Sequence, residues 1–146
     1  MRPGVEMSAD AKTPSGSLRM LIADDAFASR ELLGRIMRQL VACEIHEARD
    51  GTEARRLYRE LMPQIVFLDL DMPGMVGMSV LRDIRAERPD AFAVVVSAHS
   101  SLEHVREAIA LGVGGYVVKP FSLRRLHEVL LAYERLHGRL AWLKTT

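Results

Sequence analysis

Five polar side chains follow short apolar segments of the sequence, at positions where strands are expected to end. Asp24 and Asp25 follow the first segment, Asp69 the third, Ser97 the fourth and Lys119 the fifth. The carboxyl ends of parallel strands meet at one edge of a sheet, where open α/β proteins bind their ligands. Each residue alone could simply cap a turn or face water. Together they predict one site containing carboxylates, a hydroxyl group and an amine.

Carboxylates gathered within a few ångströms need compensation. A pair of unit charges 4 Å apart at an effective dielectric constant of 20 repels by about 4 kcal/mol. Such a cluster must protonate, bind a cation or face a positive side chain. Hard oxygen ligands suit Mg²⁺, which keeps waters and accepts phosphate oxygens. With Lys119 and Ser97 as further binding groups, the residues are suited to grip a phosphoryl group.

Five segments have the composition of β-strands. We predict strands at residues 18–23, 41–48, 65–69, 91–97 and 116–118. The apolar runs are typical of strands buried on both faces, whereas the second segment is more polar and suits a sheet edge. Strands separated by helices form a parallel sheet with right-handed crossovers and helices on both faces. The predicted fold class is therefore α/β, a doubly wound (βα)5 domain.

Apolar residues at helical spacing predict helices between these strands. The first covers about residues 27–40, the second stops near Pro63, the third is ended by Pro89 and the last begins at Ser122. Before the third helix, the sequence Met72-Pro73-Gly74 predicts a turn after Asp69.

The fourth helix is expected to stop at Gly112. Ser100 and Glu103 fit the S-x-x-E capping box, in which side chains and backbone N–H groups satisfy one another at a helix start. The apolar residues at helical spacing in this segment are Leu102, Val105 and Ile109.

Length and composition indicate one ordinary globular domain. The chain has 146 residues, of which 49% are hydrophobic and 27% charged, with a net charge of +1. The 20 basic residues are spread among 19 acidic ones, so no stripe for direct nucleic-acid binding stands out. One cysteine, Cys43, excludes an internal disulfide and a multi-cysteine zinc site. No apolar stretch approaches the roughly 20 residues of a membrane span, and with no signal-peptide pattern we expect a cytoplasmic protein.

The two ends of the chain differ from its middle. Residues 1–17 are rich in Pro, Gly and Ser and are predicted to be a flexible leader. Residues 18–137 form the predicted domain. Residues 138–146 are a tail or a continuation of the last helix, and we favour a helix that ends near His137.

Four motifs resemble those of response-regulator receiver domains in the two-component signalling family. They are Asp24-Asp25, Phe67-Leu68-Asp69-Leu70-Asp71-Met72-Pro73-Gly74-Met75, Val95-Val96-Ser97-Ala98 and Gly115-Tyr116-Val117-Val118-Lys119-Pro120-Phe121. The resemblance covers about residues 18–137. It implies a flavodoxin-like three-layer sandwich whose five-stranded parallel sheet has the strand order 2-1-3-4-5.

The resemblance also implies a role for each residue of the site. Asp69 would be the phosphoacceptor, taking a phosphoryl group from the phosphohistidine of a sensor histidine kinase or phosphotransfer protein. Asp25 and Asp69 would bind Mg²⁺ directly, Asp24 largely through metal-bound water, and Asp71 through its backbone carbonyl. Ser97 and Lys119 would bind phosphoryl oxygens, and the Lys119–Pro120 peptide bond is typically cis in such domains.

Further residues would transmit the signal and set its duration. Ser97 and Tyr116 would form the switch that alters the surface of the fourth helix, fifth strand and last helix, where a downstream protein binds. Asp71 and His99 would tune the lifetime of the phosphoryl group. Without such roles, Tyr116 is a half-buried sheet aromatic and His99 a solvated loop residue. The chain would catalyse only its own phosphorylation and dephosphorylation, as a monomer or a phosphorylation-dependent homodimer.

Two alternatives remain beside a stand-alone receiver. The chain could be the receiver part of a longer regulator with an output domain. The Asp69-x-Asp71 pattern at a strand end also resembles haloacid-dehalogenase-like phosphatases. That family expects the pattern near its beginning, and this chain instead has an earlier acid pair and a Met-Pro-Gly sequence, so we disfavour this interpretation.

Overall fold

The computed structural model describes residues 18–72, 77–98 and 101–138, in which strands and helices alternate. The strands are β2 (Leu18–Ala23), β3 (Cys43–Ala48), β4 (Ile65–Asp69), β5 (Phe92–Ser97) and β6 (Gly115–Val118). The helices are α1 (Phe27–Leu40), α2 (Gly51–Leu61), α3 (Gly77–Glu87), α4 (Leu102–Ala110) and α5 (Leu123–His137).

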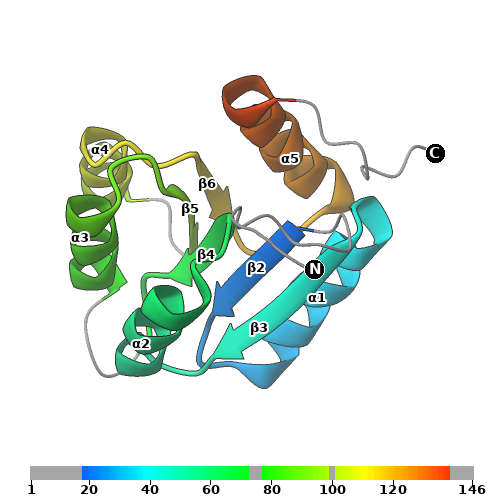
Figure 1. The fold of residues 1–146 in the computed structure, drawn as a ribbon, viewed down its shortest axis with the longest axis horizontal. Helices are drawn as coiled ribbons and strands as arrows, with labels where there is room; N and C mark the ends of the chain where they lie inside the picture. Colours follow the sequence, from blue (N-terminus) through cyan, green and yellow to red (C-terminus); the bar gives the residue numbers. More distant parts are fainter. Residues whose placement is uncertain (1–17, 73–76, 99–100, 139–146) are drawn as a thin grey trace, which may run out of the picture.

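The strands form one parallel sheet with the order β3-β2-β4-β5-β6. Figure 1 shows α1 and α5 on one face of this sheet and α2, α3 and α4 on the other. Parallel neighbours need a crossover between them, and the helices supply it. The predicted doubly wound fold and its 2-1-3-4-5 order are confirmed.

The interior strands β4 and β5 divide their side chains between two apolar cores. Every residue of β4 and β5 is buried. Successive side chains on a strand point to opposite faces, so Phe67 packs in the core under α1 and α5 while its neighbour Leu68 packs in the core under α2, α3 and α4. The apolar runs in the sequence are therefore strands buried on both sides, as predicted.

The edge strand β3 is shorter than predicted. The predicted strand begins at residue 41, but Val41 instead closes α1 by donating its N–H to the carbonyl of Met37 at 2.9 Å. The paired strand begins at Cys43, opposite Leu18. The prediction that this strand lies at an edge is confirmed, because β3 pairs with β2 alone.

Side-chain caps define where three of the helices begin. Asp50 accepts the N–H of Glu53 at 2.8 Å before α2, and Ser122 accepts that of Arg125 at 3.1 Å before α5. At α4 the cap is Ser101, which accepts the N–H of His104. The predicted capping by Ser100 with Glu103 is thus wrong by one residue, because the first helical residue is Leu102 and its cap is the serine directly before it.

Helix α4 is held to the sheet by little apolar surface. Leu102 and Ile109 are 63% and 67% exposed, and Ala108 is its buried residue. Glu107 forms an ion pair with Arg82 of α3. The helical spacing in the sequence predicted the helix correctly, but two of the apolar residues that mark it face away from the core.

The chain ends fall largely outside the described residues. Helix α5 ends at His137, where the sequence predicts its end, and the N–H of Gly138 donates to the backbone carbonyl of Glu134 at 2.8 Å. The predicted leader at residues 1–17 and the tail after Gly138 lie outside the part of the chain that the structure describes. Among the described helices, none combines the length and apolar character needed to cross a bilayer.

The start of α3 packs directly against the strand that carries Asp69. A Cβ atom added at Gly77 would lie 2.7 Å from the carbonyl oxygen of Asp69 and from the Cα of Leu70, which are backbone atoms that cannot rotate away. At Gly34 in α1, the nearest atom would be 3.4 Å away on the side chain of Arg38.

We therefore expect Gly77→Ala and Gly34→Ala to act in opposite directions. Overpacking against backbone should lower the free energy of unfolding by about 1–3 kcal/mol at Gly77. At Gly34, alanine should be neutral or stabilising by up to about 1 kcal/mol, because it favours the helix. Urea unfolding of both variants measures this, and equal effects would contradict the packing described for Gly77.

Candidate functional site

The polar residues that end the strands lie at one edge of the sheet. Asp69 ends β4 opposite Val96, and Ser97 follows at the end of β5. The backbone N–H of Lys119 donates to the carbonyl of Ser97 at 2.8 Å, which fixes the chain leaving β6 beside β5. Asp24 directly follows β2, whose residues pair with β4. The parallel sheet thus carries all these residues to its carboxyl edge.

Three carboxylates and one ammonium group meet there. Asp24, Asp25 and Asp69 each have an oxygen atom within 4.8 Å of the others. The side chains of Asp24 and Asp69 are only 4% and 2% exposed, whereas Asp25 is exposed. The Nζ of Lys119 lies 2.9 Å from Oδ2 of Asp24 and 3.3 Å from Oδ2 of Asp69. The ammonium group therefore bridges the two buried carboxylates.

Backbone N–H groups hold the remaining oxygen of each buried carboxylate. Oδ1 of Asp69 accepts the N–H of Asp71 at 2.9 Å, and Oδ1 of Asp24 accepts the N–H of Ala26 at 2.9 Å. Each of these bonds spans two residues, as in an Asx turn. Both buried carboxylates are thus fixed at two oxygens, so their orientation is determined before any ligand binds.

Burial and charge act against each other on the titration of this site. Burial raises the pKa of Asp69; the N–H of Asp71 and the charge of Lys119 oppose this, and the charge of Asp24 adds to it. Burial alone would lower the pKa of Lys119, but its hydrogen bond with Asp24 and the charges of Asp24 and Asp69 together raise it. Lys119 is therefore charged at neutral pH, and the raised pKa of Asp69 makes this carboxyl group harder to ionise than an aspartate in water.

The arrangement fits a divalent cation. Three carboxylates and one ammonium group leave a formal charge of −2 when all are ionised. The donors are hard oxygen atoms, the ligands that Mg²⁺ prefers. Asp25 is exposed at the rim, so a cation with several bound waters can approach it. Asp24, Asp25 and Asp69 are the residues that could hold Mg²⁺.

The other residues predicted for the site are placed less centrally. Asp71 is exposed and contributes its N–H to Asp69. Tyr116 is half-buried on β6 opposite Val95, and its carbonyl accepts a bond of 2.8 Å from Arg125. The Lys119–Pro120 peptide bond is cis, as the resemblance implied. His99 lies outside the described residues, as do Pro73 and Gly74 of the predicted turn.

Arg30 is a buried arginine beside the site that the sequence alone did not single out. Its Nη1 donates to the backbone carbonyl of Asp24 at 2.8 Å, and its Nε donates to Oε1 of Glu47 on β3 at 2.7 Å. A signal was present, because Arg30 lies three residues before Leu33 and seven before Met37, on the buried face of α1. A charged residue on the apolar side of a helix is an indication of a buried polar contact.

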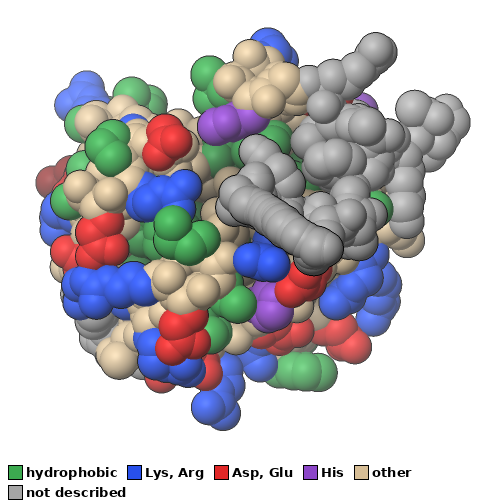
Figure 2. Space-filling view, in the orientation of Figure 1, with side chains coloured by type: hydrophobic (Ala, Val, Ile, Leu, Met, Phe, Trp, Pro, Cys, Tyr) green, Lys and Arg blue, Asp and Glu red, His purple; other side chains and the backbone are tan. Residues whose placement is uncertain are grey.

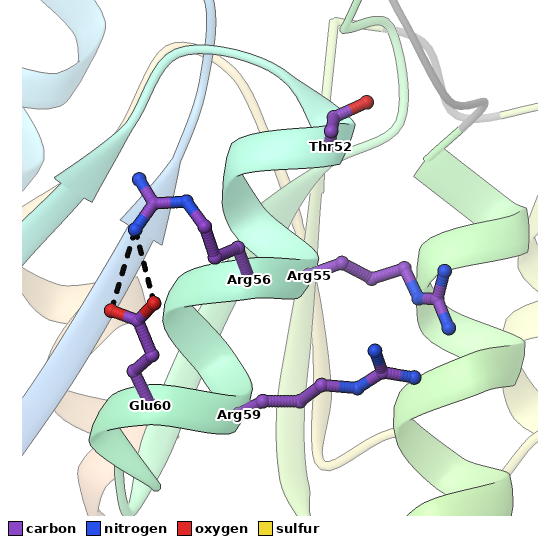
Figure 3. A pocket seen from close by; sticks show the side chains of 5 residues that line it. All are labelled: Thr52, Arg55, Arg56, Arg59 and Glu60. Carbon is purple, nitrogen blue, oxygen red and sulfur yellow. Dashed lines mark hydrogen bonds and ion pairs between the residues drawn. The ribbon is translucent and has the colours of Figure 1, made fainter.

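A hollow of about 360 Å³ lies elsewhere, on the outer surface of α2. Figure 3 shows its lining, with Arg56 paired to Glu60 on one side while Arg55 and Arg59 extend toward α3. There Arg55 pairs with Asp83 and Arg59 with Glu87. Figure 2 likewise shows basic and acidic side chains interleaved over this face. These arginines join α2 to α3, and they give no reason to place the chemistry here.

Comparison with known proteins agrees with this geometry. Residues 20–131 match the family model described as response regulator receiver domain. The chemotaxis protein CheY of Listeria monocytogenes is 37% identical over 113 residues, covering 77% of this chain and 95% of that protein. The transcriptional regulatory protein CitT of Bacillus subtilis is 28% identical, and the match covers 80% of this chain and 52% of CitT.

A solved structure supports the same relationship. The crystal structure of a two-component response regulator of the LuxR family from an Aurantimonas species has a TM-score of 0.74 and 32% identity. The match covers 85% of this chain and 88% of that chain.

The raised pKa of Asp69 predicts how stability depends on its charge. The protonated carboxyl group of Asp69 contributes its full stability at pH values below the pKa that Asp69 has in the unfolded chain. This contribution is lost as the pH rises through the higher pKa of Asp69 in the folded chain, so ionised Asp69 destabilises the fold at neutral pH. Without divalent cations, Asp69→Asn should therefore raise the melting temperature at pH 7 by a few degrees, which corresponds to a gain of about 1 kcal/mol in the free energy of unfolding. The increase at pH 4 should be smaller.

Asp90→Asn is the matched control, since Asp90 has a side chain that is 77% exposed. Thermal unfolding at both pH values gives the comparison. A melting temperature of Asp69→Asn at or below that of the parent at pH 7 would show that burial does not dominate at Asp69.

Proposed function

Because the chain belongs to the response-regulator receiver family, we propose that it accepts a phosphoryl group from a sensor histidine kinase, or from a phosphotransfer protein, onto Asp69. The observation that carries the proposal is the buried carboxylate of Asp69, fixed at two oxygens and flanked by Asp24, Asp25 and Lys119. Receiver domains are signalling switches, and they interact with kinases and downstream proteins.

Phosphoryl transfer requires a carboxylate oxygen to attack phosphorus. In the proposed step a bond forms between an Asp69 oxygen and phosphorus while the bond between phosphorus and the histidine nitrogen breaks. The imidazole leaves with the electron pair, and Asp69 becomes an acyl phosphate. The chain mainly positions the reacting groups and stabilises the charge that spreads over the phosphoryl oxygens.

The residues around Asp69 have distinct proposed tasks. Bound Mg²⁺ would supply positive charge at the phosphoryl oxygens. Asp25 and Asp69 would hold the ion directly, Asp24 largely through its water, and Asp71 through its backbone carbonyl. Lys119 and Ser97 would bind phosphoryl oxygens, Lys119 by exchanging a carboxylate partner for a phosphoryl oxygen. This is supported by the contacts of 2.9 and 3.3 Å that already hold its ammonium group beside the acceptor.

The proposed output is a shift between two conformations. When Ser97 moves toward the phosphoryl group, Tyr116 takes up the space beside it and changes the surface of α4, β6 and α5. Moving such an equilibrium from 1:99 to 99:1 requires about 5.5 kcal/mol, which a few charge-assisted hydrogen bonds of about 1.5–3 kcal/mol each can supply. Exposed Leu102, Ile109 and Val118 on this surface support its use by a downstream protein.

The wider setting is also part of the proposal. Residues 18–137 would form the receiver, which acts in the cytoplasm as a monomer or a phosphorylation-dependent homodimer and catalyses only its own phosphorylation and dephosphorylation. A receiver within a longer regulator is the alternative, and the match to CitT, which covers 52% of that protein, is compatible with it.

Asp69→Asn should abolish phosphorylation, because the amide of asparagine is a poor nucleophile. The parent chain, incubated with a small phosphoramidate donor and Mg²⁺, should gain one phosphoryl group by intact-protein mass spectrometry and lose the ability when a chelator is added. Asp90→Asn should behave as the parent, since Asp90 is exposed. Labelling of Asp69→Asn to the level of the parent rules out Asp69 as the acceptor.

A further prediction concerns the lifetime of the phosphoryl group. Replacing both Asp71 and His99 by alanine should change the dephosphorylation rate several-fold if, as we propose, these side chains flank the path of the attacking water. Loss of the phosphoryl group over time measures this rate. Asp90→Ala with His104→Ala is the control, because it removes the same residue types elsewhere. An unchanged dephosphorylation rate in the variant lacking Asp71 and His99 would refute their proposed role.

A further inference from the structure

We propose that Arg30 and Glu47 are positioning residues for the Mg²⁺ site, which they shape by fixing the backbone of Asp24. The inference rests on the proposed function, because it concerns the affinity of the acidic cluster for the metal. Neither residue belongs to the cluster of carboxylates, and neither was singled out by the sequence. Both act through the peptide unit that joins Asp24 to Asp25.

Arg30 connects three parts of the fold. It lies on α1, its Nη1 donates to the carbonyl of Asp24 after β2, and its Nε donates to Glu47 on β3. Its side chain is 9% exposed, and its guanidinium carbon lies 5.7 Å from the centre of the Phe27 ring. A buried guanidinium needs a partner for its charge, and Glu47 at 2.7 Å provides one. Glu47 thereby holds Arg30 in the orientation that reaches Asp24.

The backbone of Asp24 is held on both sides by these contacts. Its N–H donates to the carbonyl of Ala48 at 3.0 Å, its carbonyl accepts from Arg30 at 2.8 Å, and its Oδ1 accepts from Ala26 at 2.9 Å. Because the carbonyl of Asp24 belongs to the peptide unit that continues into Asp25, the bond from Arg30 also sets the direction in which Asp25 leaves the strand. Two of the three carboxylates therefore depend on it.

A positioning role and a purely electrostatic role predict opposite results. If Arg30 acted only through its charge, removing that charge would make the acidic cluster more negative and tighten Mg²⁺ binding. If Arg30 acts by fixing the peptide between Asp24 and Asp25, its removal should weaken binding, since residues that orient metal ligands typically contribute a factor of about 10–100 in affinity. The sign of the change decides between the two.

The experiment titrates Mg²⁺ alone into the metal-free chain by calorimetry, well below the unfolding temperature of every variant. Arg30→Ala should weaken Mg²⁺ binding by roughly tenfold or more. Arg35→Ala is the matched control, because Arg35 lies on the same helix with a side chain that is 64% exposed; its affinity should stay within about twofold of the parent. Unchanged or tighter binding by Arg30→Ala, or an equal loss in Arg35→Ala, overturns the proposal.

Two further variants separate geometry from charge and from folding. The double variant Arg30→Ala with Glu47→Ala removes an ion pair without changing the net charge, and it should bind Mg²⁺ as weakly as Arg30→Ala alone. Arg30→Lys keeps the charge but not the two-pronged donor, and it should also weaken binding; it carries the test if Arg30→Ala does not fold. Parent-like affinity in either variant overturns the proposal.

Asp25→Asn separates this inference from the proposed function. It should weaken Mg²⁺ binding whatever the role of Arg30. If Asp25→Asn binds as the parent does, the proposed metal site is wrong and the role of Arg30 falls with it. If Asp25→Asn loses affinity while the Arg30 variants do not, the metal site stands and only the positioning role is refuted.

Discussion

Two carboxylates, of Asp24 and Asp69, are buried at the end of neighbouring strands, and the ammonium group of Lys119 lies within 3.3 Å of both. Without that ammonium group, the carboxylates would face each other in surroundings with little water, where their repulsion is large. One of them would then have to protonate, and burial already raises the pKa of Asp69. The acidic edge of the sheet therefore depends on a positive charge supplied by Lys119 after β6.

This contact crosses most of the sheet. Lys119 follows β6, whereas Asp24 follows β2, and β4 and β5 lie between them. The backbone N–H of the same lysine is bonded to the carbonyl of Ser97 at the end of β5. Lys119 thus links the ends of four strands. Any event that draws its ammonium group away from the carboxylates changes a contact that joins these strand ends. The order of the strands alone brings their carboxyl ends to one edge of the sheet, but it does not produce the ion pair between Lys119 and Asp24.

The sequence predicted the fold well because its strongest signals come from burial. The apolar runs of β4 and β5 follow from strands covered on both faces, and the polar residues at their ends follow from a parallel sheet. Arg30 escaped because its partners, the carbonyl of Asp24 and the carboxylate of Glu47, are brought to it only by the folded chain. The predicted start of α4 was wrong by one residue because two adjacent serines can each serve as a cap. The helical spacing of its apolar residues also could not show that Leu102 and Ile109 face outward.

Both helical layers cover an apolar core, and ion pairs also link the helices of the second layer. On one face, α1 and α5 bury a continuous set of large apolar side chains. On the other, ion pairs run from Arg59 of α2 to Glu87 of α3 and from Arg82 of α3 to Glu107 of α4. Exposed ion pairs contribute little and are screened by salt, so α4 has the character of a segment with a small free energy of local opening. Helix α4 is therefore the compliant part of this layer: it can be reshaped while the apolar core that α2 and α3 cover stays intact.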